Sequence, residues 1–159
     1  MASDLNDPGT VDVLADACGR DPDLILAVEV IEHLQSPWHF LAACRRLSSN
    51  RTQLIVTTPN VGSWWSRLWF LLTGEPWGFS PESWTDPGHI HPLTETEMRG
   101  LLSANGFACK SVSLAGNLPI IWAYNWKRLL ASLLMLPLRP LMRGEKDGWV
   151  LCYHATVAS

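Results

Sequence analysis

Two continuous apolar runs in the first half of the chain predict two buried β-strands. They are DLILAVEV (residues 23–30) and QLIVTTPN (residues 53–60). Runs without polar interruption are typical of strands that are covered on both faces. Between them, residues 36–49 begin with Ser36 and Pro37, an N-cap and a first helical residue, and their apolar positions recur with helical spacing. The order strand, helix, strand predicts parallel strands joined by a right-handed crossover, and therefore an α/β fold.

A second helix is predicted over TETEMRGLLSANGF, residues 94–107. Thr94 and Glu97 have the spacing of a capping box, and Gly106 is a C-terminal cap. Two later segments alternate like strands and are candidates for an antiparallel pair at the sheet edge: ACKSVSLAG (residues 108–116) and GWVLCYHATVA (residues 148–158).

Length and composition predict one domain over residues 1–159. The chain has 159 residues, 47% of them hydrophobic, which is enough to bury a core. The formal net charge is −3 and no basic block occurs, so nothing indicates nucleic-acid binding. The four cysteines form no CxxC pair, and MASDLNDPGT is not a signal peptide. These features predict a cytoplasmic protein with reduced thiols.

Charged side chains gather where the first predicted strand ends. Glu29, Glu32 and His33 lie at or just beyond that end, and Asn60 ends the next strand. In open parallel sheets ligands bind beyond the carboxyl ends of the strands, so this position indicates a functional site. Two carboxylates and an imidazole at this spacing can converge on one cation such as Mg, Mn, Fe or Zn. The equally weighted alternative is that Glu32 and His33 only cap the following turn.

The segment DPGHIHPLT, residues 86–94, offers two further imidazoles, His89 and His91, of which His91 is the alternative ligand. His39 and His154 have no acidic sequence neighbours and are interpreted as structural. Asn60 follows a proline, so a turn role is the more ordinary interpretation for it.

The run DLILAVEVIEHLQSPWHFLAACRRLSSNRTQLIVTTPN, followed by DPGHIHPLTETEMRGLLSANGF, resembles the C-terminal half of a class I S-adenosylmethionine-dependent methyltransferase of the ubiquinone-biosynthesis-like type. The resemblance extends from about residue 4 to about residue 115. It implies that the two apolar runs are the fourth and fifth strands of a seven-stranded sheet. It also implies that Asp4, in SDLND, binds the adenine amine, that Leu5 packs on the adenine ring, and that Ala27 and Glu29 flank the methionine part of the cofactor.

The resemblance gives the charged cluster a role. Some relatives, such as the small-RNA 2'-O-methyltransferases and the catechol-type quinone methyltransferases, bind a divalent metal through an E-x-x-E-H motif and a later histidine. The matching ligands here are Glu29, Glu32, His33 and His89, the last in a D-x-x-H segment that begins at Asp86. Either the metal holds an acceptor oxygen, or His33 and His89 act as general bases.

The glycine-rich cofactor loop of such enzymes has no counterpart, because no G-x-G pattern occurs in the chain. The expected fold is therefore an incomplete Rossmann-like methyltransferase sheet that lacks the N-terminal glycine-rich strand–helix units. Three explanations are open: a truncated reading frame, which we favour, a second chain that supplies the missing half, or a fragment without methyl-transfer activity.

Two apolar segments are predicted to be insertions. Residues 61–88 contain five of the nine tryptophans and are expected to form an aromatic lid over the acceptor, although Trp64 and Trp69 suit core packing equally well. Residues 118–143 form an apolar and basic helical insertion, too short in its longest apolar run to span a bilayer. It suits peripheral membrane contact, homo-oligomer contact or cover for the sheet.

Two functions of different classes follow. The first is a methyltransferase that uses S-adenosylmethionine, with a divalent metal as a candidate second cofactor, on a small or lipid-like acceptor. The second is a non-catalytic methyltransferase-like fragment or interaction module.

Overall fold

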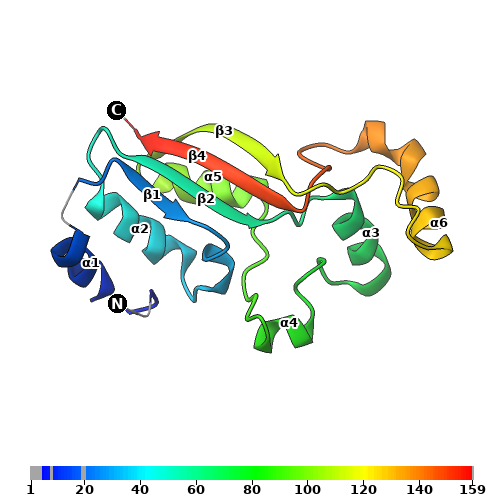
Figure 1. Cartoon of the computed structure of the whole chain (residues 1–159), viewed down its shortest axis with the longest axis horizontal. Coiled ribbons are helices and arrows are strands. Elements are labelled where there is room, and N and C mark those ends of the chain that lie inside the picture. Colours follow the sequence, from blue (N-terminus) through cyan, green and yellow to red (C-terminus); the bar gives the residue numbers. More distant parts are fainter. Residues whose placement is uncertain (1–4, 8, 19–20, 159) are drawn as a thin grey trace.

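The computed structural model of the chain describes residues 5–7, 9–18 and 21–158. Its elements, in chain order, are α1 (Thr10–Cys18), β1 (Leu24–Ala27), η1 (Ile31–His33), α2 (Pro37–Leu47), β2 (Gln53–Pro59), α3 (Trp64–Thr73), α4 (Pro81–Thr85), α5 (Glu95–Ala104), β3 (Phe107–Ala115), α6 (Trp126–Met135), η2 (Leu136–Leu141) and β4 (Val150–Val157). The strands form one sheet in the order β1-β2-β4-β3 (Figure 1).

The sheet has the predicted mixture of parallel and antiparallel pairs. β1 and β2 pair in parallel, from Leu24 opposite Gln53 to Ala27 opposite Val56. β4 lies antiparallel between β2 and β3, so the last two strands form the antiparallel pair expected at the sheet edge. The α/β class is confirmed.

Local capping explains where the two predicted helices begin. The Ser36 hydroxyl accepts a hydrogen bond from the backbone N–H of His39, and Thr94 does the same for Glu97. Each bond satisfies one of the amide groups left unpaired in a first helical turn. α5 ends at Ala104 with Asn105 as its cap, and Gly106 follows in a left-handed conformation (φ 76°).

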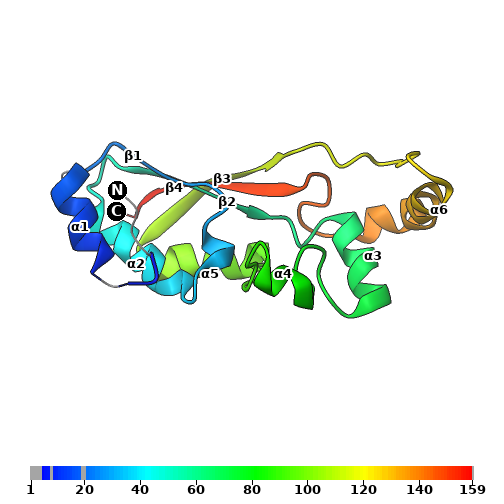
Figure 2. The ribbon, with the colours of Figure 1, turned by 60° about the horizontal axis from the view of Figure 1, so that its bottom comes forward.

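The prediction that the first two strands are covered on both faces is wrong for the described residues. α2 and α5 lie on the same side of the sheet, and none of the described helices covers the opposite side of β1 (Figure 2). Buried Leu41 and Met98 pack with Leu54 in the core on the covered side. On the other side Leu24 and Leu26 are 48% and 59% exposed. A continuous apolar run places apolar side chains on both faces of a strand, but it does not show which elements cover each face.

The first strand is also shorter than predicted. It ends at Ala27, three residues before the predicted end, because the chain turns away through Glu29, which has a positive φ of 51°. A non-glycine residue in this conformation stores backbone strain and is worth attention as a site feature.

A protruding arm lies beyond the carboxyl end of β2 (Figure 1). We define the arm as residues 61–74 and 117–143, which contain α3, α6 and η2. Its own small core contains buried Trp64, Leu118 and Met135. Burial of Trp64 agrees with the core interpretation, whereas the lid role of residues 61–88 stays a prediction.

Candidate functional site

The turn after β1 is fixed to β2 through one threonine. The Thr57 hydroxyl donates to the Glu29 carboxylate over 2.9 Å, and it accepts from the Glu29 backbone N–H over 2.9 Å. These two bonds hold Glu29 in its left-handed conformation and direct the chain into η1. Glu32 and His33 are therefore presented beneath the carboxyl end of the parallel strand pair.

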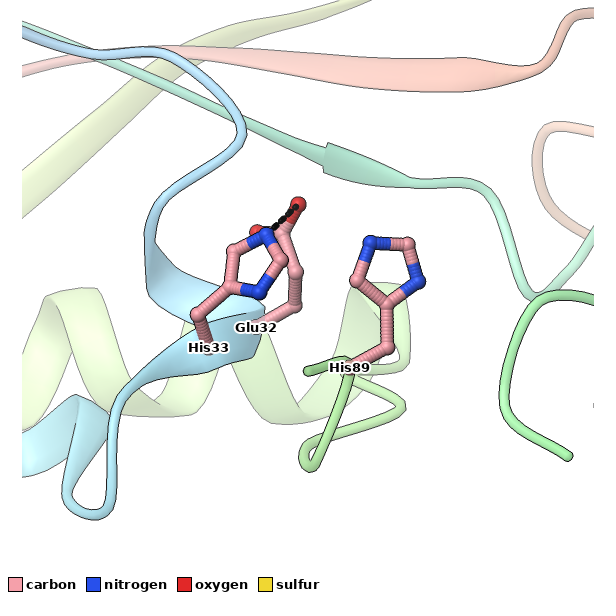
Figure 3. Close-up of side chains that lie close together, drawn as sticks. All are labelled: Glu32, His33 and His89. Carbon is pink, nitrogen blue, oxygen red and sulfur yellow. Dashed lines mark ion pairs between the residues drawn. The ribbon is translucent and has the colours of Figure 1, made fainter. Parts of the chain in front are cut away.

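The loop that carries the later histidines is attached to η1 by backbone hydrogen bonds. The N–H groups of Ile90 and His91 both donate to the Glu32 carbonyl oxygen, over 2.9 and 3.0 Å. These bonds bring two segments that are far apart in sequence into contact. As a result the rings of His33 and His89 lie side by side, with centroids 4.8 Å apart (Figure 3).

Three of the predicted ligands converge. Glu32, His33 and His89 each offer one ligand atom within 4.8 Å of the others. Figure 3 shows both imidazoles beside the Glu32 carboxylate, and His33 Nε2 lies 4.0 Å from Glu32 Oε1. We call these three residues the EHH cluster.

Hydrogen bonds determine which ring nitrogens remain free in the cluster. His33 Nδ1 lies 3.0 Å from the Gly88 carbonyl oxygen, and His89 Nδ1 lies 2.9 Å from that of Gly78. A carbonyl oxygen only accepts, so Nδ1 is the donor in both rings, and in the neutral form of each ring the lone pair is on Nε2. Metal-binding histidines commonly donate their other N–H to a backbone carbonyl in this way, which fixes the tautomer and the ring orientation.

Glu32 is the most unusual group of the site. Its side chain is fully buried, and among the described residues neither carboxylate oxygen has a hydrogen-bond partner. The pKa of this carboxyl is raised to about 7, chiefly by burial, with a smaller contribution from the nearby Glu29 carboxylate. The Thr58 hydroxyl is near enough to lower the pKa a little, but the two groups do not reach hydrogen-bond geometry. A buried carboxylate without a partner calls for a proton or a cation.

The donor set suits a transition metal. Two imidazole nitrogens and one carboxylate oxygen are the ligands of zinc, iron and manganese sites that keep positions open for a further ligand. The free Nε2 atoms and the unpartnered Glu32 oxygens are therefore a fit for a divalent cation.

Other candidates from the sequence lie elsewhere. Glu29 is not one of the three converging residues, and its metal role stays a prediction. His91 Nε2 faces the Gln35 carbonyl oxygen at 3.3 Å, so His89 is the residue that joins the cluster. Asn60 is buried; its amide donates to the carbonyls of Glu145 and Gly148, and its oxygen accepts from Gly62 N–H. The turn interpretation of Asn60 is thus the one that its contacts support.

The cofactor-binding predictions concern different parts of the structure. Asp4 lies outside the described residues. Leu5 lines a cavity of about 230 Å³ together with His39 and Arg46. Ala27 is buried in the core beside β2. The cofactor roles of all three residues stay predictions.

Sequence reasoning missed the residues that support the cluster. Thr57 was part of a predicted strand, and its polar side chain near the strand end was a usable signal. Gly78, whose carbonyl oxygen orients His89, and Phe79, whose ring centroid lies 5.2 Å from that of His89, carry no pattern that points to the site. Their roles arise only because residues 78–89 fold back on one another.

Comparison with protein families gives one match over most of the chain. Residues 4–112 match the family model described as methyltransferase domain. No curated protein matches the chain.

Solved structures with the same fold are also found. A S-adenosylmethionine-dependent methyltransferase from Archaeoglobus fulgidus superposes with a TM-score of 0.62 and 16% identity, over 98% of this chain and 66% of that one. A Haloferax volcanii protein in complex with the Trm112 methyltransferase activator gives 0.55 and 12%, over 100% and 61%. A S-adenosylmethionine-dependent methyltransferase from Thermotoga maritima gives 0.51 and 15%, over 86% and 57%. At these identities the likeness concerns the fold alone, and the chain spans 57% to 66% of the length of these proteins.

Proposed function

This chain belongs to the methyltransferase domain family, and from that premise we propose that it acts in the transfer of a methyl group from S-adenosylmethionine to an acceptor bound at the EHH cluster. The family resemblance inferred from the sequence is thereby confirmed, while the cofactor, the acceptor and the roles of single residues belong to the proposal. The observation that supports it most is the convergence of a buried, unpartnered Glu32 with two imidazoles whose Nε2 atoms are free.

In this proposal Glu32, His33 and His89 hold a divalent cation. The cation would supply Lewis acidity toward an oxygen of the acceptor. Glu32 contributes the negative charge, and its burial keeps water away from that charge. The backbone carbonyls of Gly88 and Gly78 keep the two imidazoles oriented, so that His33 and His89 are already arranged before the acceptor arrives.

As the alternative to holding a cation, the same two histidines offer the acid–base chemistry that methyl transfer to a hydroxyl or amine requires, because each Nε2 lone pair binds either the cation or a proton. An acceptor proton has to leave as the methyl group arrives, and Nε2 of His33 or His89 is an available base in the tautomer described above. His33 is partly exposed, so an acceptor can reach its ring.

Aromatic groups beside the cluster suit a ring-bearing or lipid-like acceptor. Phe79 packs near His89, and Trp84 on α4 is largely exposed on the same segment. We propose that residues 78–85 form the part of the predicted lid that contacts the acceptor.

The cofactor needs contacts that these residues do not offer. Because no G-x-G loop occurs in the 159 residues, we propose that most of the donors to the cofactor's carboxylate and ribose belong to a further segment, in the same or in another chain. In this proposal the described sheet is the acceptor half of the catalytic unit.

Metal binding is the sharpest test of the cluster. Calorimetry with Mn²⁺ and with Zn²⁺, on protein first treated with a chelator, should give about one ion per chain. Substituting Glu32→Gln or His89→Gln should weaken binding at least about ten-fold, because each removes a direct ligand. His91→Gln is the matched control, since His91 lies two residues away in the same loop and outside the cluster.

Two outcomes would reject the metal-binding role. One is a wild-type protein that binds neither ion. The other is a His91→Gln variant that loses as much affinity as His89→Gln. In either case the histidines would keep only the proton-transfer role.

A further inference from the structure

Many large apolar side chains of the arm are exposed to solvent and are not part of its small core. Six of them are between 61% and 79% exposed: Leu71, Leu72, Tyr124, Trp126, Leu134 and Leu141. They come from α3, from the segment that leads into α6, from α6 itself and from η2. Single exposed apolar residues are ordinary, but this many on one protruding part of a molecule mark an interaction surface.

This exposure occurs on an ordered scaffold. The Trp65 ring on α3 lies 5.1 Å from that of Trp122, measured between centroids, and this contact joins α3 to the segment before α6. Trp65 also packs against Trp64 on α3 and against Trp77, at 5.8 and 5.9 Å. The Ser132 hydroxyl accepts from the Trp122 backbone N–H over 2.8 Å, which fixes α6 against the same segment. The helices that carry the exposed leucines are therefore fixed by these contacts, and the leucines stay outside the arm's own core.

Charge on the arm differs in sign from charge on the rest of the chain. Residues 61–74 and 117–143 contain five basic and no acidic residues, whereas the remainder contains seven basic and all fifteen acidic ones. Arg139 is neutralised by Asp147 at the base of the arm, with Nη2 2.6 Å from Oδ1. Lys127 and Arg143 are exposed, and Arg128 is half-buried with its guanidinium over the Trp122 ring. The arm thus combines an apolar surface with a positive charge inside an acidic chain.

The aromatic residues on the arm are placed as in a membrane interface. Exposed Trp126 and Tyr124 are amphipathic rings, and cations lie directly over them: Lys127 Nζ is 5.8 Å from the Trp126 ring, and the Arg128 guanidinium carbon is 4.9 Å from the Tyr124 ring. Tryptophan, tyrosine, lysine and arginine next to exposed leucines are the groups that occupy the headgroup and upper acyl layers of a bilayer. No helix among the described residues is long and apolar enough to cross a membrane.

We propose that the arm docks on the surface of an anionic lipid bilayer. The leucines of α6 and η2 enter the upper acyl layer, and Lys127, Arg128 and Arg143 bind lipid phosphates or other anionic headgroup oxygens. Charge complementarity favours this partner, because the acidic remainder of the chain repels an anionic membrane and leaves the arm as the surface that approaches it. The arm lies at the carboxyl end of β2, at the same end of the sheet as the EHH cluster (Figures 1 and 3). Docking is independent of the metal and of the proposed reaction.

Vesicle flotation of the whole chain tests the proposal. Vesicles of neutral phosphatidylcholine are compared with vesicles that contain about one quarter phosphatidylserine. We expect strong flotation with the anionic vesicles, little with the neutral ones, and a marked loss when salt is raised from about 0.1 to about 0.5 M. The double variant Leu134→Ser/Leu141→Ser should bind anionic vesicles at least about ten-fold more weakly, because two large apolar groups are lost from the buried surface.

Two matched controls separate the arm from general stickiness. Leu24→Ser/Leu26→Ser removes two exposed leucines from β1, outside the arm, and should leave flotation unchanged. Arg51→Gln removes an exposed charge outside the arm and should have little effect, whereas Lys127→Gln/Arg143→Gln should reduce binding several-fold.

The proposal fails if anionic vesicles do not bind the protein, or if both leucine pairs affect binding equally. It also fails if light scattering shows a dimer that only the arm variants convert to monomer, because the arm would then be a contact between copies of this chain. A dimer that persists in the arm variants, combined with arm-dependent flotation, supports the lipid surface.

Discussion

At the residue scale, Glu32 links the stability of the protein to pH. Burial lifts the pKa of this carboxyl from 4.5 to about 7, so the folded protein keeps a proton that the unfolded chain releases between these values. A group that binds its proton more tightly when folded makes the folded state less stable as pH rises. The stabilisation that this proton gives to the folded state is complete below the pKa of the unfolded chain, 4.5, and is lost as the pH rises through the pKa of the folded protein, about 7.

We therefore expect the free energy of unfolding of the metal-free protein to fall between about pH 5 and pH 7.5, by up to about 3 kcal/mol relative to Glu32→Gln. Denaturant titrations of both proteins, with chelator present, measure this difference. A difference that stays constant over this pH range would mean that Glu32 is charged when folded and balanced by another group.

The same residue predicts the direction of a metal effect. A cation favours the ionised carboxylate and the neutral imidazoles, so binding releases protons and strengthens as pH rises. The metal should then restore at neutral pH the stability that the buried charge removes. This behaviour follows from one orphan carboxylate rather than from the net charge of the chain.

At the scale of elements, β1 is the exposed boundary of the sheet. It pairs with β2 on one side, and none of the described strands pairs with its other edge. Leu24 and Leu26 add exposed apolar groups to that edge. A strand edge of this kind offers unpaired backbone groups to another chain.

We expect the chain to self-associate through β1 at concentrations of about 100 µM. Leu26→Lys should reduce this association, because a lysine on an edge strand opposes pairing with a second sheet. Light scattering coupled to gel filtration measures both. Leu141→Lys on η2 is the control and should leave the association unchanged. A monodisperse wild-type monomer at this concentration would show that the edge does not pair.

The starts of two helices could be predicted from the local sequence alone. The Ser36–Pro37 start and the Thr94–Glu97 capping box were read from the sequence, and both N-caps make the expected hydrogen bonds. Capping depends on residues three apart in sequence, so it needs no tertiary information. The length of β1, by contrast, depends on tertiary structure, because the turn at Glu29 is held by Thr57 on a different strand.

At the scale of the whole molecule, cofactor affinity tests whether these residues suffice for methyl transfer. Without a glycine-rich loop the chain lacks backbone donors that would hold the cofactor at a helix N-terminus. We expect calorimetry with S-adenosylmethionine to show no binding in the micromolar range, where ordinary enzyme–ligand pairs lie. Circular dichroism of the same sample verifies that the protein is folded.

Micromolar binding of S-adenosylmethionine by the 159 residues alone would contradict this prediction. It would also show that the contacts expected at Asp4, Leu5 and Ala27 are sufficient without the loop. Absence of binding would leave the metal test and the vesicle test unaffected, since neither depends on the cofactor.

The sequence by itself determined the four strands, the helices α2 and α5 and the family, because these depend on apolar periodicity, on caps and on motifs that are local in the chain. It also placed Glu29, Glu32 and His33 correctly at the carboxyl end of a strand. Only the tertiary structure decided which face of the sheet is covered, and that His89 rather than His91 faces Glu32. That choice depends on backbone hydrogen bonds from residues 90 and 91 to the Glu32 carbonyl. No periodicity in an irregular loop encodes them, because they form only when two segments more than fifty residues apart are packed together.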